Sequence, residues 1–215
     1  MDEAGFEFTA DWFSNSLPNF EKNLSGYRGR PVRFLEIGSF EGRSTVWLLQ
    51  NILTHPASKI VCIDVAFRPA FFRNVRKVLG SQPWWKRFAR VEALAGQSVA
   101  LLPTLPANAF DFIYVDGSHS DTAVLQDAVL SFSLLKEGGV IGFDDYLWDN
   151  PEHNRFGTPK IAIDAFTSVY AHQIETLTLD YQAWFRKVKD KRAVASVVKQ
   201  ESAEMIVMPP AASVS

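Results

Sequence analysis

Strand-like and helix-like segments alternate along the chain from Val32 to Val188, and this alternation constrains the fold more than any other feature. Short apolar runs typical of buried strands are separated by segments with apolar residues at helical spacing. The expected strands are 32–37, 59–64, 89–95, 110–116, 140–144, 174–179 and 183–188. The expected helices between them are 44–53, 67–79, 97–102, 120–135 and 159–171.

Strands that alternate with helices require crossover connections, so the pattern predicts an α/β fold with helices on both faces of a sheet. We expect a Rossmann-like, doubly wound, seven-stranded and mostly parallel sheet. The last two strands are joined by Asp180-Tyr181-Gln182, which predicts a C-terminal antiparallel hairpin at the edge of the sheet.

The expected organisation is one domain with a short segment on either side. Residues 1–30 are predicted to form an N-terminal helical segment, with a helix over 9–24 that Pro18 kinks or divides. Residues 31–189 form the main domain. Residues 190–215 lose hydrophobic periodicity, and we expect them to be a mobile tail.

Charge and composition exclude several classes of protein. The formal net charge is −2, so no global positive field favours nucleic acid or an anionic membrane. Cys62 is the only cysteine, which excludes an intramolecular disulfide. No stretch reaches the roughly 18 apolar residues of a membrane helix, and the acidic start is unlike a secretory signal. We therefore expect a cytoplasmic protein, and the sequence leaves its oligomeric state open, a homodimer included.

The turn after the first strand carries the first chemical signal. Gly38 allows a sharp turn and Gly42 allows close packing where the next helix begins. Ser44 can hold a carboxylate with its hydroxyl group. The spacing differs from the G-x-G-x-x-G of pyrophosphate-binding folds, and the preceding Glu36 would repel a pyrophosphate but suit an amino or sulfonium group. The alternative interpretation is a tight turn without a ligand.

Polar residues also follow the next two strands. Asp64 closes the second strand, where an acidic side chain can accept hydrogen bonds from ribose hydroxyls. Gln97 and Ser98 follow the third strand, where small polar groups can lie at the edge of an adenine ring. Helix capping is the alternative for each of these positions.

Taken together, these residues resemble the class I S-adenosylmethionine-dependent methyltransferases, and more narrowly the methyltransferase-24 type, from about Phe34 to Val188. The resemblance implies that the turn after the first strand holds the methionine moiety, that Asp64 binds the ribose and that the segment after the third strand contacts the adenine. The cofactor-binding residues would be Glu36, Gly38, Ser39, Gly42, Ser44, Asp64, Gln97, Ser98 and Asp116.

An acidic group follows the fourth and fifth strands. Asp116 ends the fourth strand, and Asp144 and Asp145 end the fifth. We expect their carboxylates to project into one crevice, where they repel one another unless a cation, a proton or a base lies among them. Ligands that are all oxygen suit a hard ion such as Mg²⁺. The alternative role of these aspartates is loop and helix capping.

This acidic half resembles the metal-dependent catechol-type O-methyltransferases and the cephalosporin hydroxylase-like proteins. The resemblance implies that Asp116, Asp144 and Asp145 bind a divalent ion that lowers the pKa of a substrate hydroxyl. His119 departs from the catechol-type pattern and is open to three roles: general base, metal ligand, or helix-capping neighbour of Asp121. A base at His119 would require no metal. The catalytic candidates are His119, Asp116 and Asp144.

The sequence thus predicts a methyltransferase that transfers a methyl group to a hydroxyl of a small-molecule acceptor, with N-methylation as a variant. The alternative is a cofactor-binding protein with different or lost chemistry, such as a hydroxylase-like enzyme or a regulatory subunit. The loop 147–158 is predicted to act as a lid or substrate wall. Its candidate residues are Trp148, His153, Arg155 and Phe156.

Overall fold

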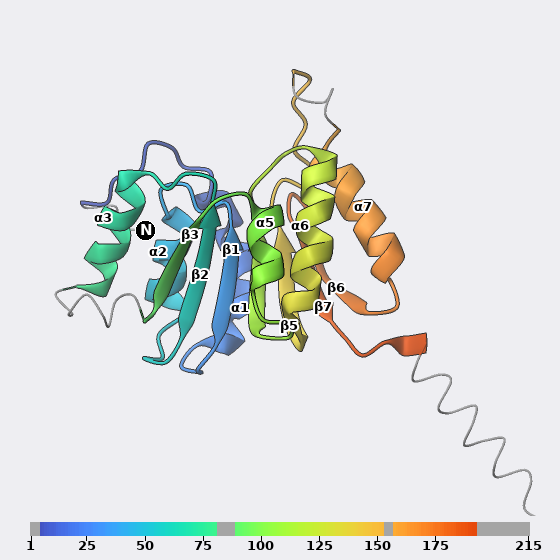
Figure 1. The fold of residues 1–215 in the computed structure, drawn as a ribbon, viewed down its shortest axis with the longest axis horizontal. Coiled ribbons are helices and arrows are strands. Elements are labelled where there is room, and N and C mark those ends of the chain that lie inside the picture. The colour runs from blue at the N-terminus through green and yellow to red at the C-terminus, as the bar shows by residue number, and fades with distance from the viewer. Residues whose placement is uncertain (1–4, 81–88, 153–156, 193–215) are drawn as a thin grey trace, which may run out of the picture.

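A seven-stranded sheet with helices on both faces forms the protein, as a computed structural model describes it for residues 5–80, 89–152 and 157–192 (Figure 1). The order across the sheet is β3-β2-β1-β4-β5-β7-β6. The strands are β1 (Arg33–Ile37), β2 (Lys59–Asp64), β3 (Val91–Ala95), β4 (Phe110–Val115), β5 (Leu135–Phe143), β6 (Ile174–Leu179) and β7 (Ala183–Lys187).

The helices form two layers, one on each face of the sheet. One face is covered by α1 (Leu17–Leu24), α2 (Arg43–Asn51) and α3 (Pro69–Leu79). The other is covered by α5 (Ser98–Leu101), α6 (Asp121–Leu134) and α7 (Pro159–Tyr170). Short 3-10 turns lie at Ser14–Ser16, Ser25–Tyr27 and Leu102–Thr104.

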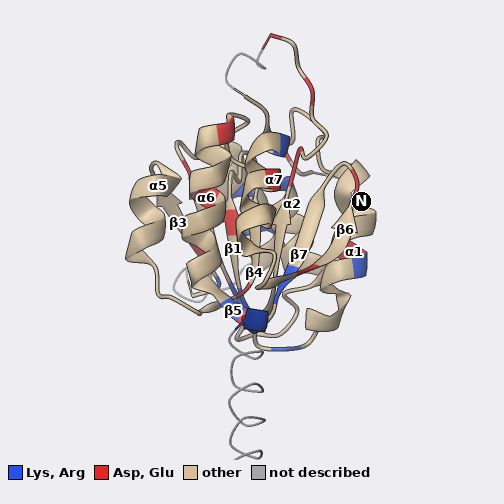
Figure 2. Ribbon diagram, turned by 90° about the vertical axis from the view of Figure 1, so that its right-hand side faces the viewer, with Lys and Arg blue, Asp and Glu red and all other residues tan. Residues whose placement is uncertain are grey.

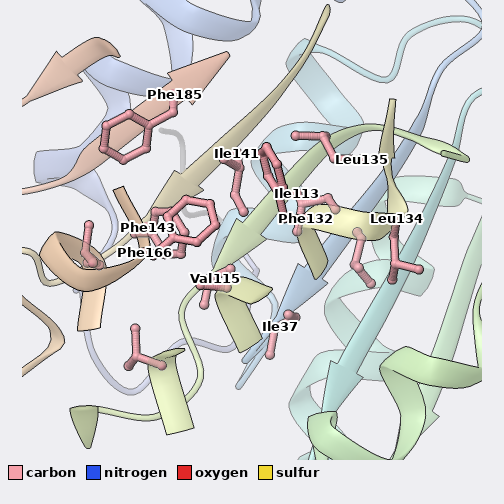
Figure 3. Close-up of a cluster of buried hydrophobic side chains, with 14 of the residues drawn as sticks. Ile37, Ile113, Val115, Phe132, Leu134, Leu135, Ile141, Phe143, Phe166 and Phe185 are labelled. Atoms are coloured by element: carbon pink, nitrogen blue, oxygen red, sulfur yellow. The ribbon is translucent and has the colours of Figure 1, made fainter. Parts of the chain in front are cut away.

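Alternation along each strand divides the core between these two layers. Leu35 and Ile37 of β1 pack under α6 and α7, together with Ile113 and Val115 of β4 (Figure 3). The intervening residues of the strands face α1, α2 and α3. Because both faces are covered, the central strands are apolar on both sides, which is the pattern that parallel sheets require.

The predicted doubly wound and mostly parallel fold is confirmed, with one refinement in the hairpin. β7 lies between β5 and β6 and runs antiparallel to both, so β6 and not β7 forms the edge of the sheet. The turn between β6 and β7 is thereby brought to the same end of the sheet as the end of β5, because β7 begins beside Phe143.

Two helix boundaries differ from the sequence prediction. The N-terminal α-helix begins at Leu17 and not at residue 9, and Pro18 lies in its first turn, where a missing N–H costs nothing. The helix α6 ends at Leu134 and not at residue 135, and β5 follows directly from Leu135, five residues before its predicted start. Gly138 and Gly139 lie inside β5, close to a shift in its register with β4.

The carboxyl ends of β1 and β4 lie side by side at the centre of the sheet, where the strand order reverses. The chain passes from β1 to β2 on one side, whereas β4 pairs with β1 on the other. Open α/β sheets bind ligands at such a point. Figure 2 shows acidic residues in the loops at this upper end of the molecule. Among the described helices, none is long and apolar enough to cross a membrane.

Candidate active site

The loop after β1 lies directly against the end of β4. Gly38 has a φ of +87°, and a Cβ atom at this position would lie 1.9 Å from the carbonyl oxygen of Asp116. The Gly38 amide donates to the carbonyl of Ile63, and the Asp116 amide donates to that of Ile37, both at 2.8 Å. Only glycine fits here, because the predicted cofactor loop packs directly against the backbone of the first acidic residue.

Gly42 and Ser44 lie where the loop becomes α2. Gly42 has a φ of +78° and precedes the first helical residue, and a Cβ there would lie 2.9 Å from the ring of Phe71. The first turn of α2 therefore packs closely on α3. Ser44 is buried and its hydroxyl is directed toward Glu36.

Glu36 is fully buried below this loop, and its carboxylate accepts hydrogen bonds from hydroxyl groups of the chain. Ser39 Oγ lies at 2.7 Å, Ser44 Oγ at 2.5 Å, and Thr45 Oγ1 is also in contact. Burial raises the pKa of Glu36, and these three hydrogen bonds oppose the increase. The Glu36 carboxylate therefore supports the loop from inside the core, and its expected contact with an amino or sulfonium group stays a prediction.

Asp64 holds the same loop from its exposed side. Its Oδ2 accepts hydrogen bonds from the amides of Ser39 at 3.1 Å and Phe40 at 2.8 Å, and its Oδ1 accepts one from the amide of Ala66 at 3.0 Å. A carboxylate has about four acceptor positions, so Asp64 can also accept from an external hydroxyl group. Its binding of a ribose stays a prediction.

Gln97 and Ser98 lie at the start of α5. The Gln97 side chain is exposed, and its residue precedes the helix in an extended conformation. The Ser98 hydroxyl instead bonds to Asp127 of α6, whose pKa is raised by burial and lowered in part by this hydrogen bond. The contact of these two residues with adenine stays a prediction. The structure shows in addition that Ser98 has a hydrogen-bond partner within the protein, Asp127.

The acidic residues after β4 and β5 come together as expected. Val115 and Phe143 are paired in the sheet, so Asp116 and Asp144 leave it side by side. One carboxylate oxygen from each of Asp116, Asp144 and Asp145 lies within 4.8 Å of the others. Asp145 has a φ of +57°, a left-handed conformation that is uncommon for residues other than glycine and that turns the chain at this point.

Burial and neighbouring charges change the acidity of Asp116 and Asp144. Burial raises the pKa of Asp116 well above its ordinary value, and the charges of Asp144 and Asp145 raise it further. Burial and the charge of Asp145 raise the pKa of Asp144 to about 6, although hydrogen bonds from Gln182 and Tyr114 oppose the increase. Three crowded oxygen ligands fit a hard divalent ion, because its charge would relieve this repulsion.

His119 lies beside the acidic group and joins it through one aspartate. Its Nε2 is 2.8 Å from Asp145 Oδ2, and its ring centroid is 4.6 Å from that of Trp148. The hydrogen bond to Asp145 raises the pKa of His119, and partial burial opposes this effect. With 45% of the side chain exposed, the ring can exchange protons with solvent.

Three further side chains at this site, Gln182, Tyr114 and Tyr181, were not predicted from the sequence. Gln182 donates to Asp144 Oδ1 at 2.8 Å and to the Tyr114 hydroxyl at 3.1 Å, and the Tyr181 hydroxyl donates to Asp145 Oδ1 at 3.1 Å. One signal could have identified Gln182: it lies two residues before Trp184 in an alternating strand, which places both on the same inner face.

The predicted lid is described only in part. Trp148 packs on His119, and the Leu147 amide lies 3.4 Å from the carbonyl of Tyr181, so the start of this loop borders the acidic group. His153, Arg155 and Phe156 lie outside the described residues, as do most of the tail and the first four residues of the N-terminal segment.

A tight glycine loop after β1, an acid after β2 and the reversal of strand order define a cofactor-binding α/β domain. Comparison with known families narrows this class. The model of the methyltransferase domain family matches residues 35–146, just over half of the chain. The protein belongs to this family, which confirms the resemblance identified from the sequence.

Curated relatives of known name include two O-methyltransferases. The chain is 28% identical over 116 residues to the catechol O-methyltransferase of Mycobacterium tuberculosis, covering 54% of this chain and 48% of the relative. It is 29% identical over 122 residues to the O-methyltransferase hkm8 of Aspergillus hancockii, covering 54% and 43%. The chain spans about half the length of the curated relatives that it matches.

Solved structures share the fold at lower identity. The O-methyltransferase from Bacillus cereus, in complex with SAH, has a TM-score of 0.61 and 19% identity, covering 86% of each chain. The MycE methyltransferase of mycinamycin biosynthesis, in complex with Mg, SAH and mycinamycin VI, has a TM-score of 0.60 and 16% identity. That match covers 84% of this chain and 51% of the other.

Proposed function

We propose that this protein is an S-adenosylmethionine-dependent methyltransferase that methylates a hydroxyl group of a small-molecule acceptor. The observation that carries the proposal is the meeting of Asp116, Asp144, Asp145 and His119 beside the glycine loop. Membership of the methyltransferase domain family supports the reaction class. The O-methyltransferases among its relatives support oxygen as the acceptor atom.

The loop between β1 and α2 is the proposed cofactor site. Gly38, Ser39 and Gly42 bring backbone close to the ligand, and Ser44 lies in the first turn of the helix. Asp64 would accept hydrogen bonds from the ribose, whereas Gln97 and Ser98 would border the adenine. The Bacillus cereus and MycE structures, both with SAH, support this cofactor for a domain of this fold.

Asp116, Asp144 and Asp145 are the proposed ligands of a divalent ion at the acceptor side. When bound, the cofactor supplies a methyl group from its sulfonium, and the ion lowers the pKa of the acceptor hydroxyl. The aspartates would hold this ion in a fixed orientation, because their carboxylates come from fixed positions at the ends of two paired strands. Mg in the MycE structure supports this assignment.

His119 is the proposed acceptor of the proton that the hydroxyl releases. The hydrogen bond that its Nε2 donates to Asp145 fixes this side of the ring and makes the imidazole a stronger base, and its exposed face can pass the proton to water. Only the neutral ring can accept a proton. The proposed metal ligands and the proposed base therefore form one site, because Asp145 is a ligand of the ion and also contacts His119.

The test is transfer of a labelled methyl group to a library of small hydroxylated acceptors, with and without a chelator. We expect transfer that stops in the chelator and returns with Mg²⁺. Binding of S-adenosylhomocysteine without transfer to any acceptor would favour the alternative of different or lost chemistry. Transfer that is insensitive to the chelator would remove the ion and leave His119 as the base.

A further inference from the structure

The buried amide of Gln182 connects the turn between β6 and β7 to the acidic group. Only 1% of this residue is exposed. Its Nε2 donates to Asp144 Oδ1 at 2.8 Å and to the Tyr114 hydroxyl at 3.1 Å. Its Oε1 accepts from Trp184 Nε1 at 3.1 Å and from Asn19 Nδ2 at 3.2 Å. All four partners come from different elements of the fold.

The direction of this amide is set by Trp184. An indole N–H can only donate, so it requires the amide oxygen on its side and leaves the NH₂ group for Asp144. Trp184 is fully buried and stacks on Phe112, with ring centroids 5.3 Å apart and planes at 6°. Gly142 makes room for the indole, since a Cβ there would lie 3.1 Å from the ring. Neither group can turn over without losing these contacts.

Asp144 therefore faces a fixed donor, unlike Asp145. Asp145 accepts from the Tyr181 hydroxyl and from His119 Nε2, but 49% of Tyr181 and 45% of the His119 side chain are exposed. A carboxylate oxygen that accepts from an amide keeps lone pairs for a cation, and its orientation is restricted. Of the two neighbouring aspartates, Asp144 is the one whose orientation the core determines.

We propose that Gln182 is a positioning residue that orients Asp144 as a ligand of the divalent ion, an inference that rests on the proposed function. It acts through Asp144 and does not itself touch the ion or the acceptor. The turn 180–182, which the sequence predicts only as a connection, thus belongs to the site.

The test is a titration of the purified full chain with Mn²⁺ alone, followed by electron paramagnetic resonance. Gln182→Met keeps the length of the side chain and removes the donor. We expect Mn²⁺ to bind about 10-fold more weakly, as is typical when a partner of a metal ligand is lost. Binding of S-adenosylhomocysteine, measured separately by calorimetry, should not change, whereas a general loss of structure would weaken both.

Two further variants keep the test decisive. Gln50→Met makes the same exchange at an exposed position of α2 and should match the wild type. Gln182→Asn retains a polar amide but is too short for both partners, so it should also weaken Mn²⁺ binding if Gln182→Met does not fold. Equal Mn²⁺ affinity in a folded Gln182 variant and the wild type would overturn this inference alone. Failure of the wild type to bind Mn²⁺ would overturn both the inference and the metal site of the proposed function.

Discussion

The two groups of carboxylates at the upper end of the sheet differ in how their charges are balanced. Glu36 and Asp64 accept hydrogen bonds from hydroxyls and amides of the loop between β1 and α2. Asp116 and Asp144 instead lie beside Asp145, and burial together with the charge of Asp145 raises the pKa of both. The first group gives a loop its shape, whereas the second retains a surplus of negative charge that an external cation can balance.

This difference indicates that the two groups have separate roles at one end of the sheet. A loop whose polar groups are already paired is preorganised, so a cofactor meets a surface that does not need to rearrange. A cluster of like charges lowers the stability of the ion-free fold, which is a common feature of functional sites. Changes to each group should therefore affect different measurements.

The largest effect is expected for Asp116→Asn, which removes one charge from the acidic group. Loss of a metal ligand costs several kcal/mol of transition-state stabilisation, so turnover should fall by roughly 10³-fold. Affinity for S-adenosylhomocysteine, measured by calorimetry, should change little. Asp190→Asn, at the opposite end of the sheet, is the control and should retain full activity. Normal turnover of Asp116→Asn would return the aspartates to a capping role.

Gly38→Ala should damage both groups at once, because its Cβ would collide with the backbone of Asp116. We expect a loss of roughly 3 kcal/mol or more in the free energy of unfolding, from overpacking and the left-handed backbone together. Chemical denaturation measures this loss.

Gly138→Ala is the matched control for that variant. Gly138 also has a positive φ, +78°, but no atom lies within 4 Å of its Cβ position. Gly138→Ala should therefore lower the free energy of unfolding by only about 1–2 kcal/mol. Equal losses of unfolding free energy in the two variants would show that the loop does not pack tightly against Asp116.

Asp144→Asn should stabilise the protein in the presence of a chelator. The pKa of Asp144 is raised to about 6, above its unfolded value, so the carboxyl favours folding below pH 4 and loses that contribution as the pH rises through 6. The gain for the variant should therefore be absent at pH 4 and reach up to about 3 kcal/mol at pH 8. Thermal unfolding at both pH values measures it, and a gain independent of pH would contradict the charge explanation.

Asp64→Asn should have the smallest effect, and this effect should be limited to the affinity for the cofactor. Loss of one charged hydrogen-bond acceptor is worth about 1.5 kcal/mol, or roughly 10-fold in affinity for S-adenosylhomocysteine. Mn²⁺ affinity should remain that of the wild type. Unchanged cofactor affinity would remove Asp64 from the ribose role, and a parallel loss of Mn²⁺ would show that the two groups are not independent.

The sequence was sufficient for the sheet and for the residues that end its strands. Asp64, Asp116 and Asp144 follow parallel strands, and the carboxyl ends of such strands always lie at the same edge of the sheet. Pattern alone did not show that Glu36 faces inward, because both faces of β1 are covered and a polar residue on either face looks the same. Gln182 and Tyr181 depend on the insertion of β7 beside β5, a pairing of distant segments that no local spacing encodes.

The position of β7 also has a consequence for the order in which the protein can be built on the ribosome. The strands that carry the glycine loop, Asp64 and Asp116 are neighbours in the sheet and are synthesised before residue 117. The strand beside β5 is the last to emerge, and it brings Gln182 and Tyr181 with it. A nascent chain can therefore assemble its cofactor loop early, while the acidic group acquires its supporting partners only when the final strand inserts.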